Sequence, residues 1–418
     1  MPRKRHDIVW KNALKSAIVI GGGIAGCSTA YELAERGYEV TLLEREHALA
    51  TAASGNPLAI LYPRLTGQDT ALEQLNIQGY LHSLRLITKL GVDRCQYLAC
   101  GVAQLLIQQR HERHIEALTS AFSSTSESEA IFKIMDAAQL SDVAGVTISH
   151  EGLYFSKAGG INLAHLCKVL VDHPRIRVLP HHAALSIERN ETNTQLWQVS
   201  ATHRPLLTAD VIVIANANDA HQLKQSQHIP LTAVRGQISY LTKTPESACL
   251  KTILCGEGYI TPPIDQLHYL GASFNRQDTD PSARDTDHES NLDLLKPLSA
   301  ALYQQLQNRV ASGRVAWRSQ TPDYLPAAGQ LLDTNALVTG KFYYNDTQDK
   351  LPWMQGIYVN IGHGSKGFLS APLCAAIIAD HATGQASPFP LTLLNGLQPN
   401  RFILRKMGLK KLAQHLVG

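Results

Sequence analysis

The sequence predicts an α/β fold in which a parallel-sheet domain is interrupted by a second, mainly antiparallel-sheet domain. The first observation is a short apolar strand at 17–20 that runs into a glycine-rich turn and a helix. The second is another glycine-opened helix at 362–380, which indicates that both ends of the chain build one domain. The third is the region 230–319, whose strand-like runs without intervening helices are typical of an antiparallel sheet.

Length and composition agree with this organisation. A chain of 418 residues exceeds one compact core, and its 44% hydrophobic and 17% charged residues are ordinary for a globular protein. No apolar run approaches the roughly 20 residues needed to cross a bilayer, so we expect a cytoplasmic protein without a membrane partner. Seven scattered cysteines without a C-x-x-C pair predict no metal site. The net charge of +3 permits a polyanionic partner without requiring one.

The first glycine turn has the features of a dinucleotide-binding loop. Three glycines form G-x-G-x-x-G between the strand and a helix that runs to about residue 36. Glu44 ends the second strand, 44 − 26 = 18 positions after the last glycine, where an acid that bonds a ribose is expected. The residues predicted to contact the cofactor here are Gly21, Gly23, Ile24, Ala25, Gly26, Glu44 and Arg45.

Two further loops are predicted to approach the same ligand. The stretch 48–66 contains small residues that let the backbone lie against a flat ligand, with Ser54 and Asn56 as polar donors and acceptors. The second glycine-opened helix offers its N-terminus to electron-rich oxygens. These loops add the predicted cofactor contacts Ala53, Ser54, Gly55, Asn56, Gly362, His363, Gly364, Ser365, Lys366 and Gly367.

The domains are expected to be discontinuous in sequence. We assign 15–95, 145–229 and 320–398 to a Rossmann-like domain, 96–144 and 230–319 to a substrate domain, and 399–418 to a basic C-terminal tail. The polar, acidic stretch 275–291 is interpreted as a solvated loop, with a substrate-side loop as the alternative.

These motifs resemble the flavin-dependent amino-acid and amine oxidases of the D-amino-acid oxidase and glycine oxidase type. Within that family, the sequence is most similar to the bacterial oxidases that modify the wobble uridine of tRNA. The segments that carry this resemblance are ASGNPLAILYP (53–63), VRGQIS (234–239), GYITP (258–262), GASF (271–274), DTDHESNL (285–292), GHGSKGFLSAPL (362–373) and PNRFILRK (399–406).

The resemblance implies non-covalently bound FAD and an activity on tRNA. The implied reaction converts 5-carboxymethylaminomethyl-(2-thio)uridine in the anticodon stem-loop to the 5-aminomethyl form and releases glyoxylate. Molecular oxygen is the expected electron acceptor. The related bacterial proteins usually begin with a methyltransferase half that this sequence does not contain, so a separate methyltransferase is an expected partner.

A substrate carboxylate requires a guanidinium, because arginine offers a planar pair of donors that stays charged when desolvated. Arg318 matches the position of the substrate-carboxylate arginine in related oxidases. Tyr259 is a candidate second donor, and Arg235 is a third candidate, with a structural ion pair as the alternative. His363 is interpreted as a packing residue rather than a catalytic base. The basic residues predicted to contact tRNA phosphates are Arg401, Arg405, Lys406, Lys410 and Lys411.

Two other functions remain compatible with these residues. An oxidase of free glycine, sarcosine or a D-amino acid would need the same fold and chemistry. A flavin-binding protein without turnover would need only the glycine loops and Glu44, but would leave Arg318 without a carboxylate to hold.

Overall fold

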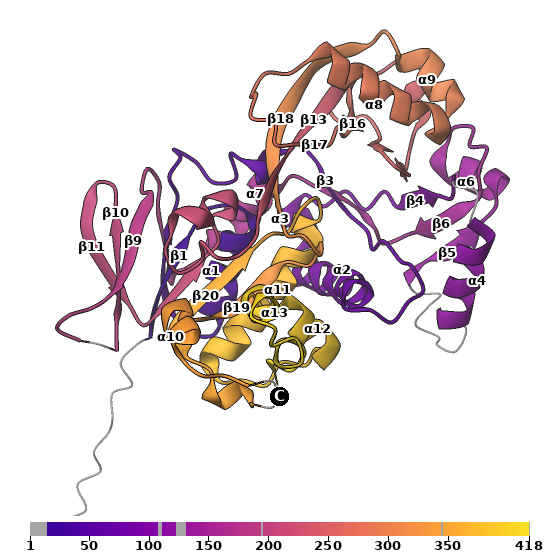
Figure 1. The fold of residues 1–418 in the computed structure, drawn as a ribbon. Helices are drawn as coiled ribbons and strands as arrows, with labels where there is room; N and C mark the ends of the chain where they lie inside the picture. Colours follow the sequence, from indigo (N-terminus) through magenta and orange to yellow (C-terminus); the bar gives the residue numbers. More distant parts are fainter. Residues whose placement is uncertain (1–14, 108–110, 123–130, 194, 344–345, 418) are drawn as a thin grey trace, which may run out of the picture.

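The structure is a computed structural model that describes residues 15–107, 111–122, 131–193, 195–343 and 346–417 (Figure 1). It confirms the predicted α/β class, with two large sheets and helices packed on both. None of the helices in these ranges is both long and apolar enough to cross a membrane.

A six-stranded sheet forms the first domain, in the order β19-β20-β12-β1-β2-β8. All neighbouring strands are parallel except β19 and β20, which pair in antiparallel fashion. The strand bounds are β1 (Ser16–Ile20), β2 (Glu39–Leu43), β8 (Ile176–Leu179), β12 (Val211–Ile214), β19 (Ala327–Leu332) and β20 (Trp353–Ile361).

The two faces of this sheet are covered differently (Figure 1). Val19, Leu42 and Val213 pack with the helices on one face, whereas Ile18 and Ile212 pack on the other face against a three-stranded antiparallel sheet. Burial on both faces explains why these strands are continuous apolar runs. The covering elements are α1 (Ile24–Glu35), α2 (Ala71–Leu90), α7 (Leu163–Val171), α11 (Gly367–Thr383), β9 (Ala184–Arg189), β10 (Trp197–Ala201) and β11 (Arg204–Ala209).

A nine-stranded, mainly antiparallel sheet forms the second domain. Its long strand β13 pairs with β18 on one side and with β16 and β17 on the other. The sheet contains β4 (Val102–Leu105), β5 (Lys133–Met135), β6 (Gly152–Phe155), β13 (Thr232–Thr242), β14 (Ile253–Cys255), β15 (Tyr259–Ile260), β16 (Leu267–Gly271), β17 (Asn275–Arg276) and β18 (Val310–Gln320).

One face of this sheet turns outward and the other turns toward the first domain. Leu241, Leu254 and Leu270 pack on the outer face against Leu295 and Leu298. The helices there are α6 (Ala137–Ala144), α8 (Asp285–Leu298) and α9 (Ala300–Leu306), as Figure 1 shows for the last two. Side chains alternate along a strand, so the residues on either side of each of these leucines face the first domain. Those residues are candidates for a site.

Two expectations about segment boundaries are corrected. The acidic stretch 275–291 is not a loop throughout, because helix α8 begins at Asp285. Asp285 and Asp287 lie in its first turn, where acidic side chains are favoured by the helix dipole. Strand β6, which we assigned to the first domain, pairs with β4 and β5 in the second. The boundary expected at 145 therefore lies too early in the sequence.

The C-terminal segment is packed rather than a free basic tail. Helix α13 (Arg401–Lys406) follows α12 (Leu391–Leu397), and Leu404 joins a small core with Leu332 and Leu337. Arg401 is fully buried and ion-pairs with Asp323 at 2.8 Å, so it is not available to phosphates. Among the basic residues named for this segment, Arg405, Lys406, Lys410 and Lys411 are exposed.

Shorter elements connect these layers. Their bounds are β3 (Ala59–Leu61), β7 (Gly159–Ile161), α3 (Val92–Cys95), α4 (His111–Phe122), α10 (Thr334–Thr339), η1 (Ala53–Gly55), η2 (Ala217–Gln222), η3 (Ser247–Cys249), η4 (Gln348–Lys350) and η5 (Leu412–Gln414).

Candidate cofactor and substrate site

The first glycine loop packs too tightly for any other residue. A Cβ on Gly26 would lie 1.7 Å from the Gly21 carbonyl oxygen, and Gly21 adopts φ +110°. The Glu44 carboxylate accepts the Gly22 N–H at 2.7 Å, so the predicted ribose-binding acid lies directly beside the turn. Because the first N–H groups of α1 have no partner within the helix, this turn can hold a phosphate group.

The loop that contains η1 meets the beginning of α1. The Ser54 hydroxyl accepts the Ile24 N–H at 3.0 Å. On the other side of η1, Arg314 donates to Asn56 Oδ1 at 2.7 Å and to the carbonyl oxygens of Thr51 and Ala52 at 2.9 and 2.6 Å. The predicted contact segment 53–56 therefore lies between α1 and strand β18 of the second domain.

The second glycine loop reaches the same place from the other end of the chain. A Cβ on Gly367 would lie 3.5 Å from the Ile24 side chain, so the starts of α11 and α1 adjoin. The Gly364 N–H donates to the Ser319 carbonyl oxygen at 2.7 Å, and His363 forms a β-bridge with Gln320. Strand β18 thus holds one loop near Arg314 and the other near Ser319.

Arg318 lies on β18 between these two attachments. It shares a face with Arg314, because residues 314, 316 and 318 alternate along the strand. It is half-buried, and its Nη1 donates to the Ser273 carbonyl oxygen at 3.2 Å. Burial lowers the pKa of Arg318, but an arginine guanidinium keeps its charge in proteins. Within the described ranges no carboxylate lies within ion-pair distance of it, so its charge is free to bind a ligand.

Tyr259 faces the same side of the sheet as Arg318. It pairs with Gly271 on β16, and a Cβ at Gly271 would lie 3.1 Å from the Tyr259 ring. Burial raises the pKa of Tyr259 to about 12, against a lowering effect of the Arg318 charge. The phenol therefore keeps its proton near pH 7 and can donate a hydrogen bond into the space beside Arg318.

The prediction that Arg235 acts in catalysis is wrong. Its side chain is fully buried on the outer face of the sheet, where Nη1 lies 2.5 Å from Asp287 Oδ2 of α8. It also donates to the carbonyl oxygens of Asp280 and Ser282 at 2.7 and 2.5 Å. These three partners engage Nε, Nη1 and Nη2 of the guanidinium, so Arg235 fixes α8 and the preceding loop to β13 instead of contacting a substrate.

Burial lowers the pKa values of two titratable residues in the second glycine loop. Burial lowers the pKa of His363 to about 4, and its Nδ1 lies 2.9 Å from the Ser370 hydroxyl, so the ring is neutral near pH 7. Burial also lowers the pKa of Lys366 to about 7, with a further lowering by the Arg64 charge. The Lys366 ammonium donates to Asn76 Oδ1 at 2.5 Å.

Unpaired polar atoms support a dinucleotide at this place. Asn216 Oδ1 and Asn218 Oδ1, directly after β12, are buried without a hydrogen-bond partner in the described part of the chain, as is His363 Nε2. Carboxyl ends of parallel strands are where dinucleotides bind in such sheets. Together with the glycine turn at 21–26, which we call the glycine cradle, and with Glu44, these atoms form a donor and acceptor set that fits FAD.

The remaining predicted contact, Arg45, lies at the edge of this region. It ion-pairs with Asp219 and with Glu46, the latter at 3.2 Å, and so joins the ends of β2 and β12. Sequence reasoning missed Arg314 and Asn216. Arg314 lies four positions before Arg318, so both fall on one face of a strand, which was a usable signal for Arg314. Asn216 follows the predicted buried strand 211–215, whose end is expected at the ligand crevice, but only its unpaired burial singles it out there.

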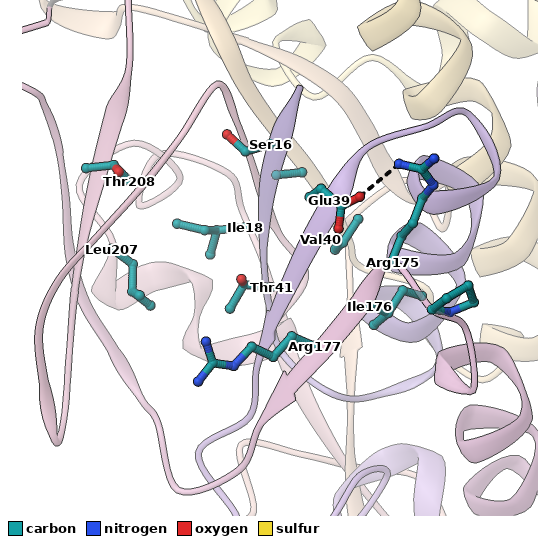
Figure 2. Close-up of a pocket in the computed structure, with 12 residues that line it drawn as sticks. Ser16, Ile18, Glu39, Val40, Thr41, Arg175, Ile176, Arg177, Leu207 and Thr208 are labelled. Carbon is teal, nitrogen blue, oxygen red and sulfur yellow. Dashed lines mark hydrogen bonds and ion pairs between the residues drawn. The ribbon is translucent and has the colours of Figure 1, made fainter. Parts of the chain in front are cut away.

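A surface cavity of about 280 Å³ lies elsewhere, at the opposite edge of the six-stranded sheet. Figure 2 shows Glu39, at the start of β2, beside Arg175, whose guanidinium lies 2.8 Å from the Glu39 carboxylate, and Ser16, at the start of β1, on the opposite side of the view. The glycine loops lie at the carboxyl ends of the strands, whereas this cavity lies at their amino ends. The cavity is therefore separate from the site described above.

Comparisons of sequence identify relatives over nearly the whole chain. It is 41% identical over 402 residues to the tRNA 5-methylaminomethyl-2-thiouridine biosynthesis bifunctional protein MnmC of Methylobacillus flagellatus, covering 96% of this chain and 61% of that protein. The protein of the same name from Chromobacterium violaceum is 36% identical, with 98% and 62% covered. The chain thus spans about three fifths of the length of these curated relatives.

Solved structures with low identity share the fold. Glycine oxidase from Geobacillus kaustophilus matches with a TM-score of 0.68 at 17% identity, covering 90% of this chain and 96% of that one. L-proline dehydrogenase from P. horikoshii matches with a TM-score of 0.72 at 15% identity, covering 93% and 98%. The family model described as FAD dependent oxidoreductase matches residues 16–381. The chain therefore belongs to this family of FAD-dependent oxidoreductases, as the glycine cradle and Glu44 indicate.

Proposed function

We propose that this chain oxidises the 5-carboxymethylaminomethyl group of a uridine or 2-thiouridine at the wobble position of tRNA, in the cytoplasm. The products are the 5-aminomethyl nucleoside and glyoxylate. The observation that carries the proposal is Arg318, a half-buried arginine beside both glycine loops with no carboxylate partner in the described ranges. The similarity to proteins of tRNA 5-methylaminomethyl-2-thiouridine biosynthesis supports tRNA as the substrate.

The reacting group is a glycine alkylated on nitrogen, and this chain can position it. Arg318 would bind the carboxylate through two parallel N–H donors, and Tyr259 would donate a further hydrogen bond. With the carboxylate fixed, the α carbon is directed toward the glycine loops. Arg318 and Tyr259 are the residues to which we assign substrate binding; no side chain is assigned as a base.

FAD held by the two glycine loops and Glu44 would supply the oxidising power, as a hydride acceptor for a carbon next to an amine. Loss of the hydride from the α carbon of the neutral amine leaves a protonated imine on the substrate. Addition of water and cleavage of the C–N bond then give glyoxylate and the primary amine. We propose molecular oxygen as the acceptor that takes the two electrons from the reduced cofactor.

The amine product is a substrate for methyl transfer. We propose a methyltransferase as a functional partner, because it would convert the aminomethyl group to the methylaminomethyl group that the relatives' names contain. The neutral His363 and the backbone N–H groups of Ser365 and Gly367, at the turn into α11, would face the cofactor and not the tRNA, whereas the Lys366 N–H donates to the His363 carbonyl oxygen.

The test is anaerobic mixing of the FAD-loaded protein with tRNA from cells that lack this activity, followed through the visible absorption of the flavin. Rapid bleaching by that tRNA, with none from glycine or sarcosine, is the expected result. Bleaching by the free amino acids alone would favour the small-molecule oxidase. An absence of bleaching with all three would favour a flavin-binding protein without turnover.

A further inference from the structure

Two exposed aromatic rings and an arginine adjoin the candidate substrate site. Phe274 is 48% exposed and Tyr324 is 57% exposed, although large aromatic side chains are usually buried. The exposed Arg276 connects them, because its guanidinium carbon lies 5.8 Å from the Phe274 ring centre and its Nη2 lies 3.5 Å from the Tyr324 hydroxyl. We call these three residues the surface platform.

The surface platform is continuous with Arg318. The Arg318 guanidinium carbon lies 6.0 Å from the Phe274 ring centre, and its Nη1 donates to the carbonyl oxygen of the preceding residue, Ser273. Phe274 therefore lies within about 6 Å of both a half-buried arginine and an exposed arginine. A molecule whose carboxylate binds Arg318 would therefore lie close to this exposed ring.

The buried side chain of Arg401 holds the turn that carries Tyr324. Arg401 is fully buried and donates to both carboxylate oxygens of Asp323, at 2.8 and 2.9 Å, and also to the Leu325 carbonyl oxygen at 2.7 Å. Tyr324 itself adopts φ +62°, an uncommon conformation for tyrosine. The ion pair between Arg401 and Asp323 thus fixes the turn in which Tyr324 has this backbone conformation, and the Tyr324 ring is exposed to solvent.

Positive charge continues along the same side. Arg405, 47% exposed, lies 3.4 Å from the Asp323 carboxylate, and the exposed Lys406 follows it in α13. The basic C-terminal residues therefore begin next to the tyrosine turn. Aromatic faces with adjacent arginines are the surface that single-stranded nucleic acid uses, because bases stack on rings and phosphates bind guanidinium groups.

We propose that the surface platform binds the unpaired nucleotides next to the modified uridine of the anticodon loop, by stacking on Tyr324 and Phe274 and by phosphate contact with Arg276. This inference rests on the proposed function. The modified group is attached to one base, so the neighbouring nucleotides must lie at the entrance when its carboxylate reaches Arg318. Arg405 and Lys406 then contact the backbone of the adjoining stem.

The experiment measures binding of a fluorescein-labelled anticodon stem-loop RNA to the FAD-loaded protein by anisotropy. Tyr324→Asn removes the ring but suits the left-handed backbone, whereas Tyr324→Phe keeps the ring and removes only the hydroxyl. Phe274→Leu and Arg276→Ala complete the set. Arg177→Ala, an exposed arginine near the cavity at the far sheet edge, is the matched control for loss of charge.

We expect Tyr324→Asn to weaken binding about tenfold, since stacking on an aromatic side chain contributes on that scale, and Tyr324→Phe to bind like the wild type. Arg276→Ala should reduce the slope of log K against log salt by about 0.7, whereas Arg177→Ala should leave it unchanged. The variants should retain the flavin spectrum of the wild type. Oxidation of tRNA should fall at least tenfold more than oxidation of the isolated modified nucleoside in Tyr324→Asn.

Equal RNA affinity in the wild type and in Tyr324→Asn and Phe274→Leu would overturn the surface platform while the proposed function stands, provided that the wild type oxidises tRNA. A wild-type protein that oxidises only the free amino acids and does not bind the stem-loop would overturn both. Equal losses with tRNA and with the isolated nucleoside would also overturn the platform, because the aromatic residues would then act only on the substrate pocket.

Discussion

Arg235 and Arg318 lie on neighbouring strands of one sheet, yet they have opposite surroundings. Arg318 pairs with Val234 across β13 and β18, and Arg235 pairs with Trp317, so the two arginines point to opposite faces. Arg235 is fully buried against Asp287 of α8. Arg318 is half-buried, faces the cofactor domain, and has no carboxylate partner in the part of the chain that the structure describes.

This difference shows what identifies a ligand-binding arginine. A buried guanidinium is normally paired, because an unpaired charge away from water is costly. Arg235 follows that rule and has a structural role. Arg318 departs from it beside two loops that fit FAD, which is why we propose a substrate carboxylate as its partner. Residue type was the same in both cases, and the pairing decided the role.

The largest effect is expected for Arg318→Ala. Removing the carboxylate anchor should lower kcat/KM for tRNA by about 10²–10³, since one partner of a buried charged pair contributes about 3–4 kcal/mol. The flavin spectrum and the unfolding midpoint should stay close to those of the wild type. Steady-state kinetics, with FAD absorption as the control, provides the measurement. Undiminished turnover would remove Arg318 from the site.

Arg235→Met should change protein stability, rather than catalysis, by a comparable free energy. The substitution leaves the Asp287 carboxylate buried without its cation, which we expect to lower the free energy of unfolding by about 3–5 kcal/mol. Urea titration followed by circular dichroism measures it. The double variant Arg235→Met/Asp287→Leu should recover part of the loss. If Arg235→Met were as stable as the wild type but lacked activity, the structural role given to Arg235 would be wrong.

Arg314→Ala should affect cofactor affinity more than stability. Arg314 holds the loop 51–56 through three hydrogen bonds, and Ser54 in that loop contacts the start of α1. We expect the Kd for FAD to rise about 10- to 100-fold, as for loss of a charged hydrogen-bonding group. Fluorescence titration of the apoprotein with FAD tests this, with Arg177→Ala as the control that should match the wild type.

The smallest effect concerns Lys366, whose pKa burial lowers to about 7. Above that pH the oxidised enzyme holds Lys366 neutral, and negative charge gained by the flavin on reduction raises the pKa of the amine so that it takes up a proton. The midpoint potential should therefore fall more steeply with pH above 7 in the wild type than in Lys366→Arg, which stays charged. Spectroelectrochemical titration from pH 6 to 9 measures both slopes. Identical slopes would mean that the charge of Lys366 does not respond to reduction of the flavin.

Local features of the chain could be predicted from sequence because their contacts are close in sequence. The strand, glycine turn, helix, second strand and Glu44 lie within 17–44, and the Glu44 carboxylate meets the Gly22 N–H only 22 positions away. The acidic stretch before Asn291 shows the limit. Its charges predicted a solvated loop, but α8 begins at Asp285, and its buried Asp287 is paired with Arg235, 52 positions earlier in the chain.

The sequence by itself therefore determined the α/β class and the glycine-rich turn with Glu44, and its family resemblance added Arg318 as a candidate for carboxylate binding. Only the tertiary structure separated Arg318 from Arg235, since strand pairing and the position of α8 decide which face each arginine occupies. The tertiary structure alone also revealed that Arg314 joins the two domains over 258 positions and that Arg401 is buried. The pairing of a charged side chain depends on residues that are far apart in sequence and close in space, and no local pattern encodes it.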